Sequence, residues 1–555
     1  MPSELDRRYD AVLAGVTGPG GMLALGTDKK GQAIVTNFPD TLPGLIRTFA
    51  AANAEFEAIV AGDERLMFPD LDTLSERVAR ALVARGIEKG DRVGIAMRNC
   101  PAWVVLYMGI VKAGAIATLF NGWWESHELE HALQLTEPKL IFADMPRSDR
   151  IHAASVECQV MALAIELPIG DALAELFDSD DPAIVLPRVD PDDDATILFT
   201  SGSTGEAKGA VSSHRAVTTG AYTYAAGLIT MLGLLTQDGR APATKPRVLL
   251  SVPLFHVTGE VPVMLTSFVI GRCLVMMPKW DAGEALRLIQ KEKVTYFVGV
   301  PTMSLELMTH PAHDNYDLSS LTDIAAGGAP RPTSHVTRLQ ETFPLAKPAL
   351  GYGLTETNAV GAHNFWGNYA AKPASTGRAH APFVELAILG VGDTHLQRGE
   401  TGEIGIRTAA NIRGYWRAKE ATEALYTDDH FIRTGDIGYL DEDGYLFIVD
   451  RKKEIIIRGG ENIAAAEVEA ACYAHPDVAE ASVFGAPDER LGEVPVAIIH
   501  AAPGATFTPD DLKAFLAGRL ARFKIPERFV FVAEELPKLG TGKIDRRALK
   551  ARFGS

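Results

Sequence analysis

The chain has 555 residues, of which 47% are hydrophobic and 23% are charged, so it has the composition of a globular protein and the length of several domains. A net charge of −17 excludes a general attraction to nucleic acid or anionic lipid, so an anionic ligand must be held by a local cationic or amide-rich pocket. The four cysteines are far apart and form no Cys-x-x-Cys pair. This spacing indicates neither a disulfide framework nor a zinc site, and it favours a reducing, cytoplasmic setting.

Strand and helix patterns alternate along the longer, N-terminal part of the chain. Short β-rich runs such as RVGIAM, KLIFAD, RVLLSV and VTYFVGV are separated by helical patterns such as LSERVARALVARG and AGEALRLIQKEK. This alternation predicts an α/β fold in which the sheets are largely parallel.

The most apolar stretch runs from Ala102 to Phe120. It is interrupted by Lys112 and two glycines, whereas a membrane-spanning helix needs about twenty uninterrupted apolar residues. We therefore expect a buried helix followed by a strand, and no membrane span.

The pattern changes to closely spaced strands and turns at about 383–450, which predicts a small β-barrel-like subdomain. The charged residues that follow Asp450 indicate a domain boundary with a hinge at 451–453. The predicted fold is therefore α/β, with a large N-terminal domain of α/β layers at 1–450 and a small α+β C-terminal domain at 454–555.

The segment ATILFTSGSTGEAKGAVSSH at 195–214 has an apolar strand, a loop of small and hydroxyl residues, a lysine and a second strand. Glycines let backbone amides approach an anion closely, while hydroxyls and the lysine add donors and charge. A plain turn can have the same composition, and the loop departs from the Walker A pattern because Gly209 follows Lys208. The residues expected to hold phosphates are Thr200, Ser201, Gly202, Ser203, Thr204, Gly205 and Lys208.

The full string TSGSTGEAKG resembles the phosphate loop of the adenylate-forming superfamily, which includes acyl-CoA synthetases, firefly luciferase and the adenylation domains of nonribosomal peptide synthetases. Further motifs of that superfamily follow in the same order across most of the chain. The resemblance implies an enzyme that uses ATP, Mg²⁺ and coenzyme A, with a mobile C-terminal domain.

GYGLTET at 351–357 is similar to the stretch whose aromatic ring, here Tyr352, stacks on adenine. The resemblance implies that Thr355 meets the α-phosphate and that Glu356 holds magnesium together with Thr204, although Glu356 alone would be a solvated loop acid. Magnesium prefers one or two carboxylates together with phosphate oxygens, so this chemistry is adequate. The residues that the resemblance places around adenine are Gly328, Ala329, Pro330, Gly351, Tyr352 and Gly353.

TGD at 434–436 resembles the ribose-binding motif, because a carboxylate can accept hydrogen bonds from both ribose hydroxyls. In isolation, Asp436 would be a turn or cap residue. By the same resemblance, Arg451 contacts the nucleotide and Lys453 is the hinge residue, although Lys453 can equally be a solvated surface residue.

LGTGKI at 539–544 resembles the motif whose lysine, here Lys543, enters the active site during adenylation. Adenylation brings the anionic acid against the anionic α-phosphate, so the site must neutralise charge. The resemblance implies that rotation about the hinge then withdraws Lys543 and brings Gly459 and Gly460 towards the thiol of coenzyme A.

SVPLFHVTG at 251–259 resembles the segment in which a histidine, here His256, lies between the acyl and thiol paths, although it can also be a core histidine. Small and apolar residues nearby suggest a cavity for a fatty or other apolar carboxylic acid. Trp123 and Trp124 either shape an entrance or pack in the core, and we favour the core. The residues expected to line the acyl site are His256, Val257, Val300, Met303, Gly327 and Asn358.

The sequence thus predicts a cytoplasmic acyl-CoA synthetase of fatty acid metabolism whose catalytic residues are Lys543, Thr355, Glu356 and His256. The alternatives are a ligase that loads a carrier-protein thiol, an oxygenase like luciferase, or a nucleotide-binding pseudoenzyme without chemistry. Retention of Lys208 and Asp436 beside Glu356 and Lys543 argues against the pseudoenzyme. Members of the superfamily are often dimers, which leaves a homodimer open.

Overall fold

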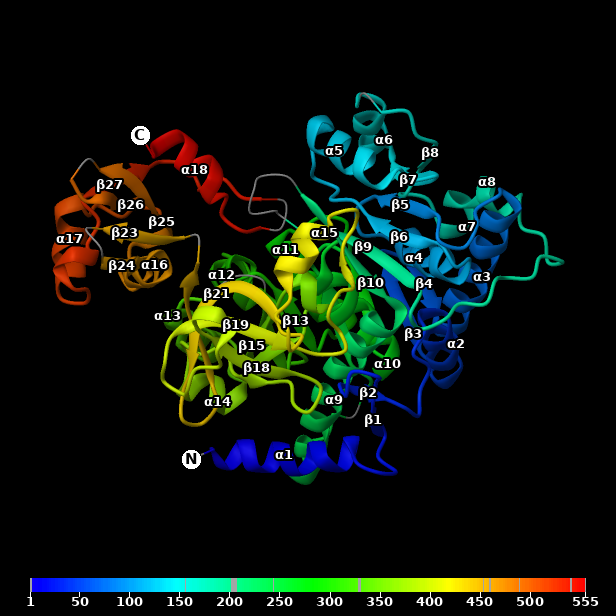
Figure 1. Ribbon diagram of the computed structural model, residues 1–555, viewed down its shortest axis with the longest axis horizontal. Coiled ribbons are helices and arrows are strands. Elements are labelled where there is room, and N and C mark those ends of the chain that lie inside the picture. The colour runs from blue at the N-terminus through cyan, green and yellow to red at the C-terminus, as the bar shows by residue number, and fades with distance from the viewer. Residues whose placement is uncertain are drawn as a thin grey trace.

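The computed structural model describes residues 2–154, 156–200, 207–242, 244–327, 331–452, 454–458, 461–488, 490–539 and 542–554. The N-terminal part holds a seven-stranded, a nine-stranded and a four-stranded sheet, and the C-terminal part has a five-stranded sheet of its own. Figure 1 shows the C-terminal part, in orange and red, to one side of the larger part.

The seven-stranded sheet carries the strands on either side of the predicted phosphate loop. Its order is β20-β10-β9-β6-β5-β7-β8, and the pairs from β9 to β8 are parallel. β9 and β10 are antiparallel, and Thr200 pairs with Lys208 across them. The bounds are β5 Arg92–Ala96, β6 Ile116–Leu119, β7 Leu140–Asp144, β8 Val160–Leu163, β9 Asp194–Thr200, β10 Lys208–Ser213 and β20 Gly414–Tyr415.

The apolar stretch at 102–120 forms the expected helix and strand. Helix α4 (Pro101–Lys112) is buried along its whole length, and β6 follows it. The charge of Lys112 is compensated by Asp72, because Nζ lies 2.5 Å from Oδ1. Across the described ranges, no helix combines the length and the apolar character needed to cross a bilayer.

The nine-stranded sheet carries the segments predicted to contact adenine and the acid. Its order is β17-β16-β15-β14-β13-β11-β12-β3-β4, and its central pairs from β15 to β3 are parallel. Helices cover both faces of such strands, which explains their apolar runs. The bounds are β3 Glu57–Ala61, β4 Glu64–Met67, β11 Arg247–Leu250, β12 Cys273–Met276, β13 Tyr296–Gly299, β14 Asp323–Ala326, β15 Lys347–Gly353, β16 Gly361–Phe365 and β17 Arg378–Ala379.

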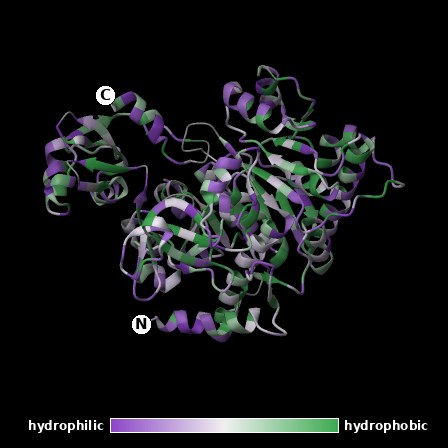
Figure 2. Ribbon diagram, viewed as in Figure 1, coloured by the Kyte–Doolittle hydropathy of each residue, from purple (hydrophilic) through white to green (hydrophobic). Residues whose placement is uncertain are grey.

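One continuous apolar core joins the two large sheets through α2, α3, α4, α9 and α10. A second core lies under α11, α12 and α13 on the nine-stranded sheet. Figure 2 shows the hydrophobic residues, in green, concentrated in these inner strands and helices. The bounds are α1 Glu4–Thr17, α2 Leu42–Ala52, α3 Phe68–Ala84, α9 His214–Gln237, α10 Thr266–Ile270, α11 Ala282–Glu292, α12 Pro301–Thr309, α13 Thr333–Thr342 and α14 Trp366–Ala371.

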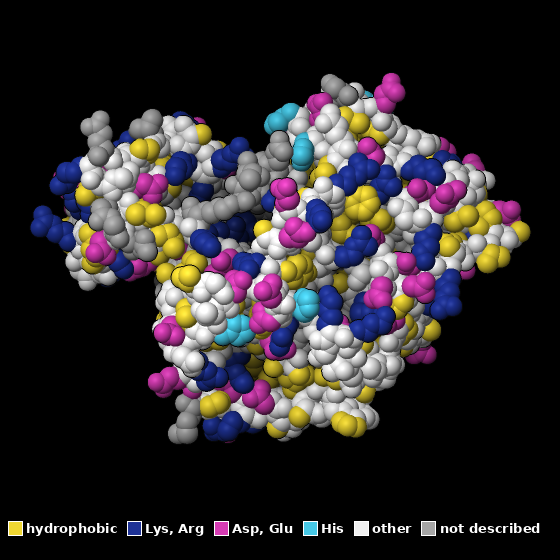
Figure 3. Space-filling view, viewed as in Figure 1, with side chains coloured by type: hydrophobic (Ala, Val, Ile, Leu, Met, Phe, Trp, Pro, Cys, Tyr) yellow, Lys and Arg dark blue, Asp and Glu magenta, His cyan; other side chains and the backbone are white. Residues whose placement is uncertain are grey.

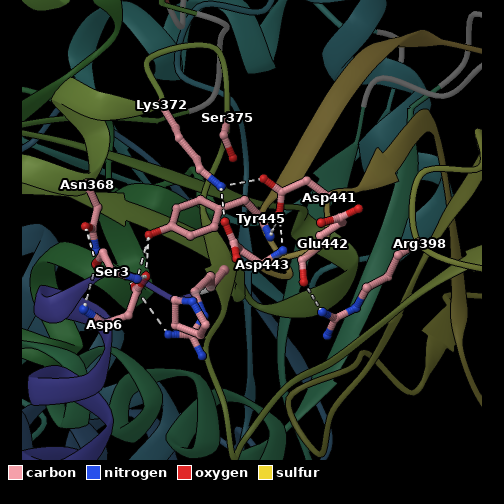
Figure 4. A network of polar contacts seen from close by, with 12 residues as sticks. Ser3, Asp6, Asn368, Lys372, Ser375, Arg398, Asp441, Glu442, Asp443 and Tyr445 are labelled. Carbon is pink, nitrogen blue, oxygen red and sulfur yellow. Dashed lines mark hydrogen bonds and ion pairs between the residues drawn. The ribbon is translucent and has the colours of Figure 1, made fainter.

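The N-terminal helix α1 is fastened to two distant segments, as Figure 4 shows. Nδ2 of Asn368 donates to Oδ1 of Asp6 over 3.0 Å, and the hydroxyl of Tyr445 donates to the same oxygen over 3.0 Å. Beside them, Nζ of Lys372 lies 2.5 Å from Oδ2 of Asp441. These contacts hold α1 against α14 and the turn that precedes β22.

The small subdomain is an open antiparallel sheet in the order β18-β19-β21-β22. The sequence predicts a barrel-like subdomain, whereas these four strands leave β18 and β22 at open edges, because so few strands do not close into a barrel. The bounds are β18 Glu385–Leu389, β19 Gly402–Arg407, β21 Ile432–Leu440 and β22 Leu446–Arg451.

The C-terminal part has its own apolar core. The small sheet ends at Arg451 and the C-terminal sheet begins at Ile455, so the chain changes sheets where the hinge is predicted. The α/β layers, the small β subdomain and the small C-terminal unit of the predicted fold are thus present. The bounds are β23 Ile455–Arg458, β24 Glu461–Ala464, β25 Val478–Asp488, β26 Gly492–Ala501, β27 Arg528–Val532, α16 Ala465–Tyr473, α17 Pro509–Ala517 and α18 Arg546–Phe553.

Charged side chains of both signs are mixed over the face of the molecule seen in Figure 3. The net charge of −17 is therefore not gathered into a single acidic patch on that face. An anionic ligand therefore has to be recognised by local groups.

Candidate active site

The β9–β10 hairpin frames the predicted phosphate site. Thr200 and Lys208 face each other at its end, and a methyl group at Gly209 would lie 2.9 Å from Cγ2 of Ile197. Nζ of Lys208 lies 5.2 Å from the ring centroid of Tyr415 on β20. The loop residues Ser201, Gly202, Ser203, Thr204 and Gly205 lie outside the described residues.

The end of β15 brings the predicted adenine strand to the same pocket. A methyl group at Gly353 would lie only 1.9 Å from the carbonyl oxygen of Ala359, so this crossing requires glycine. The hydroxyl of Tyr352 donates to Oδ2 of Asp436 over 2.7 Å. Burial and the charge of Asp436 raise the pKa of Tyr352 well above its usual value, so the phenol stays protonated.

Glu356 follows in a short 3₁₀ helix, Thr355–Thr357, and its Oε1 accepts a 2.7 Å hydrogen bond from the hydroxyl of Tyr415. No described residue bonds its second carboxylate oxygen, and the side chain is only partly buried. A single carboxylate with a free oxygen in the same region as Lys208, the lysine predicted to bind phosphate, fits the preference of Mg²⁺ for carboxylate and phosphate oxygens. Tyr415 was missed by the sequence analysis, because its only signal is an aromatic residue in a Gly-Tyr-Trp run.

Asp436 is buried, with an exposed fraction of 4%. Gly435 before it has φ +74°, a conformation that favours glycine and turns the carboxylate inward. Nε of Arg451 lies 3.3 Å from Oδ1 of Asp436. Burial raises the pKa of Asp436, while Arg451, the Tyr352 hydroxyl and Lys543 oppose the rise.

Lys543 reaches this pocket from the distal C-terminal segment. Burial and the nearby Arg451 lower its pKa to about 8, while Asp436 acts in the opposite direction. A methyl group on the neighbouring Gly542 would lie 3.0 Å from Cγ2 of Val300. The C-terminal segment therefore enters the same site as the nucleotide motifs.

Comparison with known proteins decides the family. The pattern of AMP-binding enzymes matches residues 46–416, and the pattern of the AMP-binding enzyme C-terminal domain matches residues 467–543. The chain belongs to the AMP-binding enzyme family. The second match ends at Lys543, the residue that lies near Asp436 and Arg451 of the N-terminal part.

This AMP-binding enzyme is 34% identical over 541 residues to the long-chain-fatty-acid–CoA ligase of Bacillus subtilis (strain 168), a match that covers 92% of this chain and 94% of the relative. It is 32% identical over 503 residues to 4-coumarate–CoA ligase 1 of Solanum tuberosum, covering 89% of this chain and 90% of the relative. The structure of o-succinylbenzoate coenzyme A synthetase (MenE) from Bacillus subtilis with ATP and magnesium ion matches with TM-score 0.77 and 26% identity, covering 91% of this chain and 99% of that chain.

These matches confirm the predicted superfamily and the predicted enzyme class. The protein is an ATP-dependent, AMP-forming acid–CoA ligase, and its substrates and cofactor are a carboxylic acid, ATP, coenzyme A and Mg²⁺.

Most of the residues predicted to line the acyl site lie close together in the structure. Val300 caps α12, which also carries Met303, and both face Gly542. A methyl group at Gly327 would lie 3.8 Å from the carbonyl oxygen of Gly351. These contacts join the predicted acyl and nucleotide residues in one region.

His256 is the predicted gate between the acyl and thiol paths. Burial, with a smaller effect of Lys543, lowers its pKa to about 3, so the imidazole is neutral at pH 7. Val257 beside it is buried.

Trp123 is 44% exposed, and its ring centroid lies 4.9 Å from that of Phe255. It therefore lies at the surface next to this segment, and the prediction that it packs in the core is wrong. Trp124 is partly buried against Phe199, at 5.2 Å between rings.

The side chain of Asn358 does not face the acyl site. It is fully buried, and its Nδ2 donates to the carbonyl oxygen of Ala410 over 2.7 Å and to Oγ of Ser212 over 3.0 Å. With φ +50° it turns the chain after the 3₁₀ helix, so its role is structural.

Some of the predicted site residues lie outside the described residues. They are Gly328, Ala329, Pro330, Lys453, Gly459 and Gly460.

Proposed function

We propose that this enzyme activates an apolar monocarboxylic acid, and that Lys543 supplies positive charge to the adenylation step in the orientation seen here. The observation that carries the proposal is the position of the partly buried Lys543 near Asp436 and Arg451, with Gly542 against Val300. Apolar side chains therefore line the acid side of the site, and charged side chains line its nucleotide side.

In the first step, a carboxylate oxygen of the acid attacks the α-phosphorus of ATP, and the bond to the β-phosphate breaks to release pyrophosphate. Negative charge accumulates around the α-phosphate, so a preorganised cation lowers the barrier. Lys543 and Lys208 are the side chains that would supply this positive charge, and Glu356 is the carboxylate that would hold Mg²⁺.

In the second step, the sulfur of coenzyme A attacks the acyl carbon, and the bond to AMP breaks. The tail that carries Lys543 occupies the site beside Val300, so we infer that it withdraws before the thiol attacks. The segment between Arg451 and Ile455, where the chain changes sheets, is the hinge that we propose for this movement. The homodimer and the cytoplasmic location stay predictions.

Separating the two half-reactions tests this assignment. Lys543→Ala is expected to lose about 10²–10³ in the rate of acid-dependent exchange between pyrophosphate and ATP, the usual cost of one catalytic donor. It should still convert a supplied acyl-adenylate and coenzyme A to thioester. Lys538→Ala is the matched control, because Lys538 is held by Glu480 at 3.0 Å and Glu535 at 2.8 Å in the same tail. Equal losses in both half-reactions would contradict the proposal.

A further inference from the structure

Helix α9 packs against the segment Gly259–Leu265, which follows His256 in the chain. A methyl group at Gly220 would lie 3.0 Å from Cγ1 of Val261 and 3.1 Å from the carbonyl oxygen of Asn358, so α9 packs closely against this segment and against the turn that follows the Thr355–Thr357 helix. Tyr224 follows one helical turn later on the same face. Its hydroxyl lies 3.8 Å from the position of a methyl group on Gly351, the glycine next to Tyr352.

Tyr224 is held in place at its far end and along its ring. Its hydroxyl donates to the carbonyl oxygen of Ala359 over 2.6 Å, and its ring lies 5.1 Å from that of His380, which is 5% exposed. Burial raises the pKa of the phenol well above its usual value, so the donor proton is retained. A large ring fixed in this way acts as a rigid wall.

Small residues continue along the sheet beyond this ring. Alternate residues of a strand share a face, so Ala349, Gly351 and Gly353 of β15 face the same side. Ala349 pairs with Ala325 of β14, which adds a second small side chain to that face. Leu350 packs on the opposite side with Val336 and Tyr369.

We propose that Tyr224 is the end wall of the acyl pocket and restricts the acid to a compact body, a short straight chain or a single ring. The inference rests on the proposed function, because it deepens the same site. Gly351 and Gly353 leave room for the acid next to the nucleotide. The Tyr224 ring closes this space on the side where Ala349 and Ala325 lie. The acid is then compact even though several relatives are named for long-chain fatty acids.

The test compares butanoate, benzoate, octanoate and dodecanoate in the acid-dependent exchange of pyrophosphate into ATP. The wild-type enzyme is expected to use butanoate or benzoate with a higher kcat/KM than dodecanoate. Tyr224→Ala should raise the ratio of dodecanoate to butanoate by about tenfold or more, since each newly buried methylene contributes about fourfold. Tyr224→Phe keeps the ring and should leave the ratio unchanged.

Tyr222→Ala is the matched control on the same helix, because the hydroxyl of Tyr222 bonds Pro39 at 2.6 Å and its ring packs near Phe38 and Phe49. It should leave the ratio unchanged. If Tyr224→Ala does not fold, Tyr224→Leu should shift the ratio in the same direction. An active Tyr224→Ala enzyme with the wild-type ratio, or a wild type that prefers dodecanoate, would overturn the inference. A folded wild type that shows no exchange with any acid would instead overturn the proposed function.

Discussion

The hydroxyl of Tyr415 donates to Glu356 over 2.7 Å, while the ring of the same tyrosine lies 5.2 Å from Nζ of Lys208. Tyr415 comes from β20, which pairs with β10, so one side chain links the predicted magnesium carboxylate to the end of the phosphate loop. Neither Glu356 nor Lys208 is close to Tyr415 in the sequence.

Tyr415→Phe is expected to weaken the apparent affinity for Mg²⁺ about tenfold or more, because it removes a hydrogen bond to a charged group. The measurement is the Mg²⁺ dependence of the exchange of pyrophosphate into ATP. Tyr439→Phe is the control, since the Tyr439 ring stacks on Phe447 at 5.0 Å, in the small sheet. An unchanged Mg²⁺ dependence in Tyr415→Phe would show that the bond does not position the carboxylate.

Lys543 should make adenylation depend on pH. Its pKa is lowered to about 8, so the ammonium is largely protonated at pH 7, half protonated near pH 8 and largely neutral above pH 9. We expect kcat/KM for ATP, which reports the free enzyme, to fall as pH rises through 8. Thioester formation from a supplied acyl-adenylate should lack this fall. The same pH profile for both half-reactions would argue against Lys543 as its source.

Gly353→Ala should disturb the adenine strand. The added methyl group would lie 1.9 Å from the carbonyl oxygen of Ala359, so the backbone has to move. Overpacking of this kind lowers the free energy of unfolding by about 1–3 kcal/mol, and we expect activity to fall with it.

Gly15→Ala is the contrasting variant for the same thermal and chemical unfolding measurements. Gly15 lies within helix α1, and a methyl group there would meet nothing within 4 Å. Alanine in an open helical position stabilises by about 0.5–1 kcal/mol relative to glycine. A Gly353→Ala protein as stable as the wild type would mean that the strand crossing relaxes more easily than its geometry indicates.

Glu260 should make stability fall as pH rises. It is fully buried, its Oε1 lies 2.7 Å from the Tyr107 hydroxyl, and burial raises its pKa to about 8. Between the unfolded value of 4.5 and pH 8, the folded protein keeps a proton that the unfolded chain has lost, so increasing pH favours unfolding. Glu260→Gln removes that titration.

The check is the denaturant midpoint of both proteins at pH 5 and pH 8. The difference between Glu260→Gln and the wild type should move in favour of the variant at the higher pH. Replacement of the exposed Glu55 by Gln serves as the control. A constant difference at both pH values would refute the assignment.

The sequence by itself determined the elements and the family motifs. Apolar runs with strand and helix periodicity predicted β5, β7, β11 and β13, together with α3 before β5, α4 between β5 and β7, and α11 between β11 and β13, because local pattern controls which faces must be buried. The phosphate-loop, adenine and ribose motifs were recognised because their function depends on short, contiguous residue strings.

Only the tertiary structure decided which of these sequence motifs lie close together in space. Lys543 is far from Asp436 in the chain, and their proximity depends on how the C-terminal unit packs on the larger part. The same applies to Tyr415 beside Glu356, to Tyr224 beside Gly351, and to Asn358, which the structure turns away from the acyl site to bond Ala410 and Ser212. The periodicity of apolar residues predicts that a residue is buried, but it does not identify the residues that it contacts. Those partners come from elements that only tertiary packing brings together.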